Sequence, residues 1–172
     1  MTKKHILITG PSGCGKTYIS TILRNKGINA PDGDLVQELS DWFDGNKNIV
    51  ICPDDADEEF LNTHEFLWDK NFLKSYLKNQ DELYLFGMSG NIFDMIDLFD
   101  KVYFLKASPE LLAERLRHAS RENPMGNTDY QLQNALNWAK EIEENAIGLG
   151  IQMIDSNQTP EAIFEEINKK FI

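Results

Sequence analysis

The first residues of this chain that could do chemistry are GPSGCGKT, which span Gly10–Thr17. They match the pattern G-x-x-x-x-G-K-[ST] at every fixed position. In that pattern the glycines let the backbone curl, so that successive amide N–H groups face an anion at the start of a helix. The Lys16 ammonium would then contact the β- and γ-phosphates of a nucleoside triphosphate, and the Thr17 hydroxyl would hold Mg²⁺. The alternative is a glycine-rich turn that binds nothing.

The nucleotide contacts are predicted along the whole of this loop. They fall on Gly10, Ser12, Gly13, Cys14, Gly15, Lys16 and Thr17. The loop amides would favour the Cys14 thiolate, so that reversible oxidation could block nucleotide binding. The alternative is that Cys14 is simply a small residue that fits the loop.

Strands and helices that alternate along the chain would position this loop. HILIT, residues 5–9, precedes the loop as a short buried strand, and KTYISTILRNKG follows it as a helix that ends near Gly27. Further strands are expected at residues 28–30, 83–86, 102–105 and 151–154, and the type of the apolar run 49–52 stays open. Helices are expected over 35–43 and 63–78, from the cap Ser108 with Pro109, after residue 128, and from Thr159 with Pro160.

This alternation predicts an α/β fold with a parallel sheet that helices cover on both faces. Ligands of such sheets bind at the carboxyl ends of the strands. That rule brings five segments to one edge of the sheet. They are the phosphate loop, residues 32–34, residues 87–91, the helix start at Ser108 and residues 157–159.

Length and composition suit a single soluble domain over residues 1–172. With 41% hydrophobic and 10% aromatic residues, the chain can fill one core. The apolar run Ile6–Ile8 is too short for a signal-peptide core, and no stretch approaches a membrane span. Two cysteines, Cys14 and Cys52, are too few for a disulfide framework and wrongly spaced for a metal site. We therefore expect a cytoplasmic protein, either a monomer or a homodimer, that does not bind membranes.

The net charge of −11 is concentrated in one segment. Between Pro31 and Asp69 there are twelve acidic residues and a single basic one, Lys47, whereas acids and bases balance in the rest of the chain. Such a field repels a phosphate backbone, so a nucleic-acid partner is not expected.

In combination, several segments resemble the small P-loop kinases of the nucleoside-monophosphate-kinase and shikimate/gluconate-kinase type. The matching segments are ITGPSGCGKT, the PDGD at residues 31–34, VYFLKASPELLAERLRHASREN and IDSNQTPEAIFEEI. The resemblance implies a three-layer P-loop NTPase fold with a five-stranded parallel sheet. It also implies an acceptor lobe at about residues 31–80, a short lid at about 117–128, and transfer of the γ-phosphoryl group of ATP to a small acceptor.

The resemblance also implies roles for particular residues. Arg117 and Arg121 would be the phosphate-clamping arginines of the lid, with Arg115 as a further candidate, although all three could instead be solubilising residues of an amphipathic helix. Asp34 lies where shikimate- and gluconate-type kinases carry a carboxylate near the acceptor hydroxyl, and it is the expected general base.

The metal and the adenine have weaker signals. Asp32 could hold Mg²⁺ through water together with Thr17, or it could simply cap the turn that follows it. The strand at residues 83–86 ends in Gly87, where many P-loop enzymes have an aspartate, so a second metal contact stays unassigned. Gln158 follows the last strand, where related kinases contact adenine.

The distribution of charge narrows the range of acceptors that the protein could use. No arginine lies between Arg24 and Arg115, so an anionic acceptor would have few cations to hold it, although Lys70 or Lys74 could reach one. We expect a hydroxyl-bearing acceptor that is uncharged or cationic, such as a nucleoside, a sugar or an amino-alcohol. The alternatives are a nucleoside monophosphate kinase and a nucleotide-binding sensor without catalysis.

Overall fold

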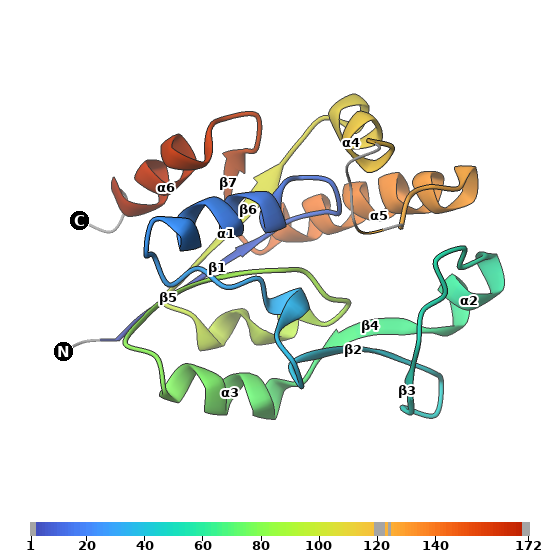
Figure 1. Cartoon of the computed structure of the whole chain (residues 1–172), viewed down its shortest axis with the longest axis horizontal. Coiled ribbons are helices and arrows are strands. Elements are labelled where there is room, and N and C mark those ends of the chain that lie inside the picture. Colours follow the sequence, from blue (N-terminus) through green and yellow to red (C-terminus); the bar gives the residue numbers. More distant parts are fainter. Residues whose placement is uncertain (1–2, 119–122, 124, 170–172) are drawn as a thin grey trace.

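Four parallel strands form the central sheet of the molecule. The computed structural model describes residues 3–118, 123 and 125–169, and within them the strand order is β5-β1-β6-β7. The sheet lies between two groups of helices (Figure 1). The strands are β1 (Lys4–Thr9), β5 (Glu82–Phe86), β6 (Lys101–Lys106) and β7 (Gln152–Asp155). The predicted α/β class with a parallel sheet is therefore confirmed.

Successive side chains of a strand point to opposite faces of the sheet. Because helices cover both faces, the strands are buried on both sides. Ile6 and Ile8 pack into one core and Leu7 into the other, and none of the three is exposed. Four of the helices add buried side chains to these cores. They are α1 (Lys16–Asn25) and α6 (Pro160–Lys169) on the face of Ile6, and α3 (Lys70–Lys78) and α5 (Asp129–Gly148) on the face of Leu7.

The predicted fifth strand, residues 28–30, is not a strand of this sheet. The chain does run beside β5 here, since Tyr84 N donates to Asn29 O at 2.9 Å and Phe86 N donates to Pro31 O at 3.0 Å. Because Pro31 has no N–H, it cannot return a hydrogen bond to β5. Only one isolated parallel bridge forms, between Asp32 and Phe86. The segment still delivers Asp32 to the carboxyl end of the sheet.

The helix expected over 35–43 does not form, so that prediction is wrong, and the helix expected over 63–78 forms only as α3 (Lys70–Lys78), so that prediction is wrong in its start. A second sheet takes the place of the missing helical residues. It is antiparallel, in the order β3-β2-β4. Before it, the helical conformation lasts for a single 3-10 turn, and Glu38 has a φ of +68° that no right-handed helix contains. The elements are the 3-10 turn η1 (Gly33–Leu35) and the strands β2 (Ser40–Phe43), β3 (Ile49–Val50) and β4 (Glu65–Trp68).

Two aspartates set the helix boundaries that the sequence pattern misplaced. Asp57 accepts a hydrogen bond from Phe60 N at 2.9 Å and so begins α2 (Glu58–Thr63). Asp69 accepts from Asn71 N and Phe72 N, at 2.7 and 2.8 Å, and so begins α3. Both are ordinary N-caps. The residues between α2 and α3 pair with β2 instead of continuing a helix.

The C-terminal half follows the prediction closely. Ser108 caps α4 (Pro109–Leu116) by accepting from Leu111 N at 3.2 Å, and Thr128 forms a capping box with Gln131 at the start of α5. A 3-10 segment, η2 (Ile92–Leu98), joins β5 to β6. No helix in the described ranges is long and apolar enough to cross a membrane.

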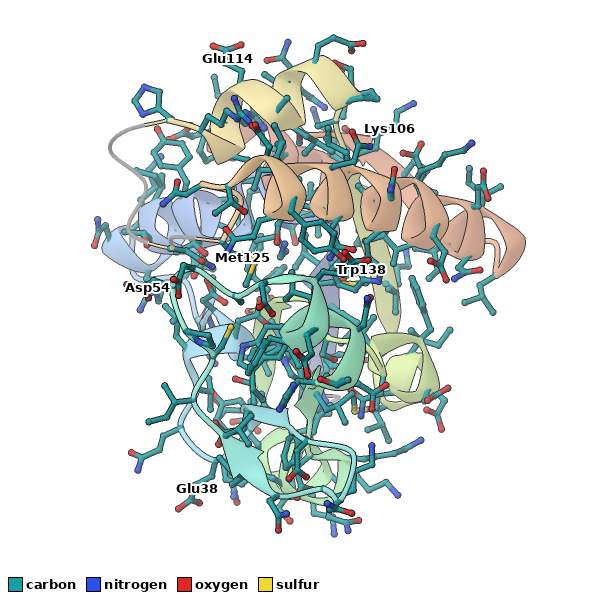
Figure 2. The ribbon with its side chains drawn as sticks, turned by 90° about the vertical axis from the view of Figure 1, so that its right-hand side faces the viewer. Glu38, Asp54, Lys106, Glu114, Met125 and Trp138 are labelled. Carbon is teal, nitrogen blue, oxygen red and sulfur yellow. The ribbon has the colours of Figure 1, made fainter. Side chains whose placement is uncertain are left out.

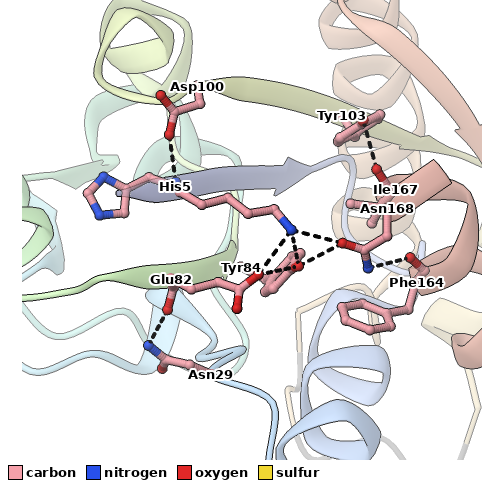
Figure 3. A network of polar contacts seen from close by, with 10 residues as sticks. His5, Asn29, Glu82, Tyr84, Asp100, Tyr103, Phe164, Ile167 and Asn168 are labelled. Atoms are coloured by element: carbon pink, nitrogen blue, oxygen red, sulfur yellow. Dashed lines mark hydrogen bonds and ion pairs between the residues drawn. The ribbon is translucent and has the colours of Figure 1, made fainter. Parts of the chain in front are cut away.

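Polar contacts tie the amino ends of β1 and β5 to α6, as Figure 3 shows. The Lys4 ammonium donates to Tyr84 Oη at 2.6 Å, to Glu82 Oε1 at 3.0 Å and to Asn168 Oδ1 at 2.9 Å. This network lies at the end of the sheet opposite to the GPSGCGKT loop. None of these three contacts involves residues at the carboxyl edge of the sheet.

Candidate functional site

The segment GPSGCGKT forms a curled loop between β1 and α1, at the carboxyl edge of the sheet. Its three glycines, Gly10, Gly13 and Gly15, have φ values of +150°, +86° and +98°. A Cβ on Gly10 would lie 2.5 Å from the Leu105 carbonyl oxygen, so a side chain there would collide with β6. The sequence pattern thus builds the strand, loop and helix that it predicted.

The Lys16 side chain is buried inside the curl of this loop. Its ammonium donates to Gly10 O at 2.7 Å and to Pro11 O at 3.0 Å, and only 8% of the residue is exposed. The first amides of α1 have no intrahelical acceptor, and the helix dipole adds positive potential at the same point. The loop therefore combines a lysine ammonium with helix amides, which is the arrangement that binds an anion.

Cys14 is part of the core and not a reactive thiol. Its side chain has no exposed surface and packs in the same cluster as Ile6 and Leu112. Burial raises the pKa of this thiol despite the nearby Lys16 and Arg115 charges. The expectation of a favoured thiolate is therefore wrong, and Cys14 is a small residue that fits the loop.

Arg115 of α4 braces the back of the loop. Its guanidinium donates to Gly13 O at 3.4 Å and to Cys14 O at 3.3 Å. It also donates to Ser156 Oγ at 3.2 Å and to Ser156 O at 3.3 Å. Arg115 thus joins the phosphate loop to the segment after β7.

The side-chain oxygens of Thr17 and Asp32 lie next to each other beside the loop. Thr17 Oγ1 donates to Asp32 Oδ2 at 2.5 Å. The other carboxylate oxygen, Oδ1, accepts from Asp34 N at 3.1 Å and caps the turn η1. One oxygen therefore caps the turn, as one interpretation of Asp32 expects, and the other accepts from Thr17, while a metal at Asp32 stays a prediction.

Asp34 lies in the same group, with its carboxylate held by two donors. Oδ1 accepts from Trp68 Nε1 at 3.0 Å and from Met88 N at 3.1 Å, and Oδ2 shares the Met88 N–H at 3.2 Å. Burial raises the pKa of Asp34 from 3.8 to about 6. The Lys16 charge opposes this shift and the Asp32 carboxylate adds to it. A carboxylate with this pKa is suited to accept a proton near neutral pH.

The raised pKa predicts that Asp34 costs stability at neutral pH. Because the folded pKa lies above the ordinary value of 3.8, the stability that protonated Asp34 gives is complete below about pH 4 and is lost as the pH rises through about 6. Asp34→Asn should therefore raise the free energy of unfolding at pH 8 by about 1–3 kcal/mol, since one pKa unit corresponds to about 1.4 kcal/mol.

Urea unfolding at pH 8 and at pH 4.5 measures this effect. The gain should shrink at the lower pH, where Asp34 is largely protonated. Asp44→Asn, at an exposed site in the same segment, is the control and should give no gain. Equal gains of Asp34→Asn at both values would show that the charge of Asp34 is not the cause.

The structure describes only one of the two predicted lid arginines. Arg117, at the end of α4, forms an ion pair with Asp129 at the start of α5. Arg121 lies outside the described residues. Gln158, predicted at the adenine, is exposed and donates to Asp155 O at 3.1 Å and to Glu166 Oε2 at 3.2 Å.

Gln131 connects the first turn of α5 to the acidic segment, a contact that the sequence did not reveal. It is 1% exposed, and its Nε2 donates to Asp54 O and to Ala56 O, both at 3.1 Å. Its Oε1 accepts from Gly126 N at 3.0 Å. Figure 2, which faces the right-hand side of Figure 1, labels Asp54 of the acidic segment and Met125, which precedes α5 in the chain. The two hydrogen bonds from Nε2 hold the start of α5 against the acidic segment. The residues that they join lie far apart in the sequence, so no local pattern predicts them.

Trp68 and Asn91 are further residues whose roles sequence reasoning missed. The sequence placed Trp68 inside a helix, whereas it is the last residue of β4. The Asn91 side chain bonds to the backbone of Trp68 and leaves the helical segment η2 without a side-chain cap. No motif signals either contact, because both depend on the antiparallel sheet.

Comparison with known proteins agrees with this geometry. The chain is 26% identical to a curated protein of Thermosipho africanus named "Nucleotide-binding protein", over 99% of this chain and 57% of that protein. The chain thus spans little more than half the length of the curated relative that it matches.

Two solved structures share the fold at low sequence identity. Deoxyadenosine kinase from M. mycoides, with bound dATP, is 14% identical with a TM-score of 0.51, over 97% of this chain and 98% of that one. Shikimate kinase from Aquifex aeolicus is 14% identical with a TM-score of 0.56, over 96% and 95%. The P-loop NTPase fold expected from the resemblance is therefore confirmed, with four strands in the described parallel sheet in place of five.

A family model described as "AAA domain" matches residues 6–134, which is more than half of the chain and includes the phosphate loop, Asp32 and Asp34. This chain belongs to the AAA domain family.

Proposed function

We propose that this protein is an ATP-dependent phosphotransferase that moves the γ-phosphoryl group of ATP to a hydroxyl of a small, uncharged or cationic acceptor. One observation carries the proposal. The Asp34 carboxylate, with its raised pKa, lies in one group with Lys16 of the phosphate loop and with the Thr17–Asp32 pair. A carboxylate at this place could take up the proton that leaves an acceptor hydroxyl, a task that phosphoryl transfer has and nucleotide binding alone does not.

The side-chain oxygens of Thr17 and Asp32 are suitable ligands for Mg²⁺. A hydroxyl and a carboxylate are the hard oxygen ligands that this ion prefers, and substrate phosphates and water complete such sites. The described ranges contain no group of three or more His, Cys, Asp or Glu side chains that could hold a metal ion. When bound, the ion would neutralise charge on the phosphates.

The residues of the chain would share the transfer as follows. Lys16 and the loop amides hold the β- and γ-phosphates, and Asp34 orients the acceptor hydroxyl. As the acceptor oxygen bonds to the γ-phosphorus, its proton passes to Asp34, and the bond between the γ-phosphorus and the β–γ bridging oxygen breaks to release ADP. Arg117 and Arg121 would add positive charge from the lid.

The charges of the acidic segment favour an acceptor without a negative charge. Lys47 is paired with Glu65 at 3.0 Å, and Lys70 is paired with Asp97 at 3.6 Å on η2. Lys74 lines a hollow with Lys3 and His5 at the amino edge of the sheet, far from the loop. These lysines are therefore not placed to hold an anion beside Asp34.

A panel of acceptors tests the proposal by acceptor-dependent ADP release from Mg-ATP. The uncharged or cationic members are deoxyadenosine, glucose and ethanolamine, and the anionic members are AMP, shikimate and gluconate. We expect stimulation by at least one member of the first group and by none of the second. Stimulation by AMP alone would make the protein a nucleoside monophosphate kinase and would refute the charge argument.

The name of the curated relative favours one further function, a nucleotide-binding protein without transfer activity. Such a protein would bind ATP with the same loop and release no ADP with any acceptor. Calorimetry with ATP, combined with the panel, distinguishes the two functions. Binding without acceptor-dependent turnover would reject the kinase.

A further inference from the structure

Trp68 reaches the candidate general base from a different part of the fold. It is the last residue of β4, paired with Ser40 of β2, and its indole N–H donates to Asp34 Oδ1 at 3.0 Å. Only 2% of Trp68 is exposed. A strand of the antiparallel sheet thus brings a hydrogen-bond donor to the carboxyl edge of the parallel sheet.

Two glycines make room for the indole ring. A Cβ on Gly33 would lie 2.6 Å from the ring, and a Cβ on Gly87 would lie 2.3 Å from it. Real Cβ atoms do not approach other atoms so closely, so neither position tolerates a side chain while the ring stays in place. This explains Gly87, which stands where many P-loop enzymes have an aspartate.

The backbone of Trp68 is held as firmly as its ring. Trp68 N donates to Asn91 Oδ1 at 3.0 Å, and Asn91 Nδ2 donates to Trp68 O at 2.9 Å. Ser89 Oγ donates to the same Asn91 Oδ1 at 2.9 Å and so fixes the orientation of the amide. The indole N–H is therefore presented to Asp34 by a rigid support, which is what precise positioning of a reactive group requires.

The two oxygens of Asp34 are left in unequal states. Oδ1 accepts from both Trp68 Nε1 and Met88 N, whereas Oδ2 shares only the longer contact of 3.2 Å with Met88 N. A carboxylate without the indole could rotate and exchange its oxygens. With the indole in place, one oxygen is committed to the protein and the other keeps its capacity to accept.

We propose that Trp68 is the positioning residue of the general base, whose indole N–H fixes the Asp34 carboxylate so that Oδ2 receives the proton of the acceptor hydroxyl. This inference rests on the proposed function, because it assigns a proton transfer to Asp34. It adds a residue that lies outside the phosphate loop and the lid, and it gives the antiparallel sheet a part in catalysis.

A kinetic experiment with Trp68→Phe tests the positioning role. Phenylalanine keeps an aromatic ring in the pocket and removes only the donor and one ring. With the panel member that the wild type turns over fastest, kcat should fall by about 10- to 100-fold, as expected for the loss of a hydrogen bond to a charged group, while the KM for ATP stays within about twofold. The matched control is Trp138→Phe on α5, which should leave kcat unchanged.

A spectroscopic experiment tests the contact without any acceptor. The three tryptophans give three indole N–H signals in an NMR spectrum of ¹⁵N-labelled protein, and the one missing in Trp68→Phe is that of Trp68. In Asp34→Ala, we expect this signal to move upfield and to exchange faster with water, while those of Trp42 and Trp138 stay in place.

The outcomes separate the two proposals. If the wild type turns over an acceptor and Trp68→Phe keeps its kcat, the positioning role is wrong and the kinase stands. If the Trp68 signal ignores Asp34→Ala, the contact itself is wrong, even where Trp68→Phe folds poorly. If the wild type turns over no acceptor, the proposed function fails, and the positioning role fails with it even where the contact is found.

Discussion

Lys16→Ala should weaken ATP binding by about 100-fold or more and reduce turnover at subsaturating ATP in proportion. Lys16 is the first residue of α1, and its buried ammonium lies 2.7 Å from Gly10 O at the beginning of the loop. Charge-assisted hydrogen bonds to phosphate contribute about 1.5–3 kcal/mol each, so the loss of two of them gives an effect of this size.

Calorimetry with ATP and Mg²⁺ measures this loss, and two variants sharpen it. Lys16→Met keeps most of the aliphatic stem and removes the charge, so it should bind as poorly as Lys16→Ala if the charge matters more than the packing. Lys26→Ala removes an exposed lysine from the other end of the same helix, where it pairs with Glu161, and should bind like the wild type. ATP affinity of Lys16→Ala within about threefold of the wild type would refute the assignment of the loop.

The parts of the fold that local sequence determines were predictable. The run Ile6–Ile8 is apolar at successive positions because both faces of β1 are buried, and Ser108 with Pro109 begins α4 exactly where an N-cap and a first-turn proline belong. The phosphate loop is equally local, since strand, loop and helix are continuous in sequence. For these elements the residues that form the structure also carry its signal.

The strands of the acidic segment could not be predicted because β2 pairs with β4, which follows only after β3 and α2 in the sequence. Asn62 and Glu65 have the spacing of a capping box, yet Glu65 pairs with Phe43 and begins β4. The true caps, Asp57 and Asp69, are less conspicuous among so many acids. Tertiary pairing overrides local preference in such strands.

The candidate site also contains residues that the local sequence predicts and residues that it does not. Lys16 and Thr17 could be named from the sequence because they end the loop motif, and Asp32 and Asp34 because they follow an extended segment that runs beside β5. Trp68 could not, because its contact with Asp34 needs the path across Gly33 and Gly87 that only the folded sheets create. The residues proposed to carry the reaction are thus visible in motifs, whereas the residue proposed to position Asp34 is not.

Asp34→Asn should lower kcat by about 10²- to 10⁴-fold while the Kd for ATP stays within about twofold. This is the range that general-base catalysis contributes. The amide oxygen of asparagine can still accept from Trp68 Nε1 and Met88 N, so the side chain should keep its place and lose only its basicity. Because burial raises the pKa of Asp34 to about 6, the kcat of the wild type should rise with pH through that value and then level off.

Initial rates between pH 5 and 8.5, with the fastest acceptor of the panel, measure both effects. The small residual activity of Asp34→Asn should lack the rise near pH 6, whereas Asp44→Asn, with its exposed side chain bonded to Asn48, should keep both the rise and the rate. A variant that lost ATP binding together with kcat would make Asp34 part of the nucleotide site. A variant that kept kcat would mean that the proton leaves the acceptor without help from this carboxylate, and the stability lost through its burial would then need another explanation.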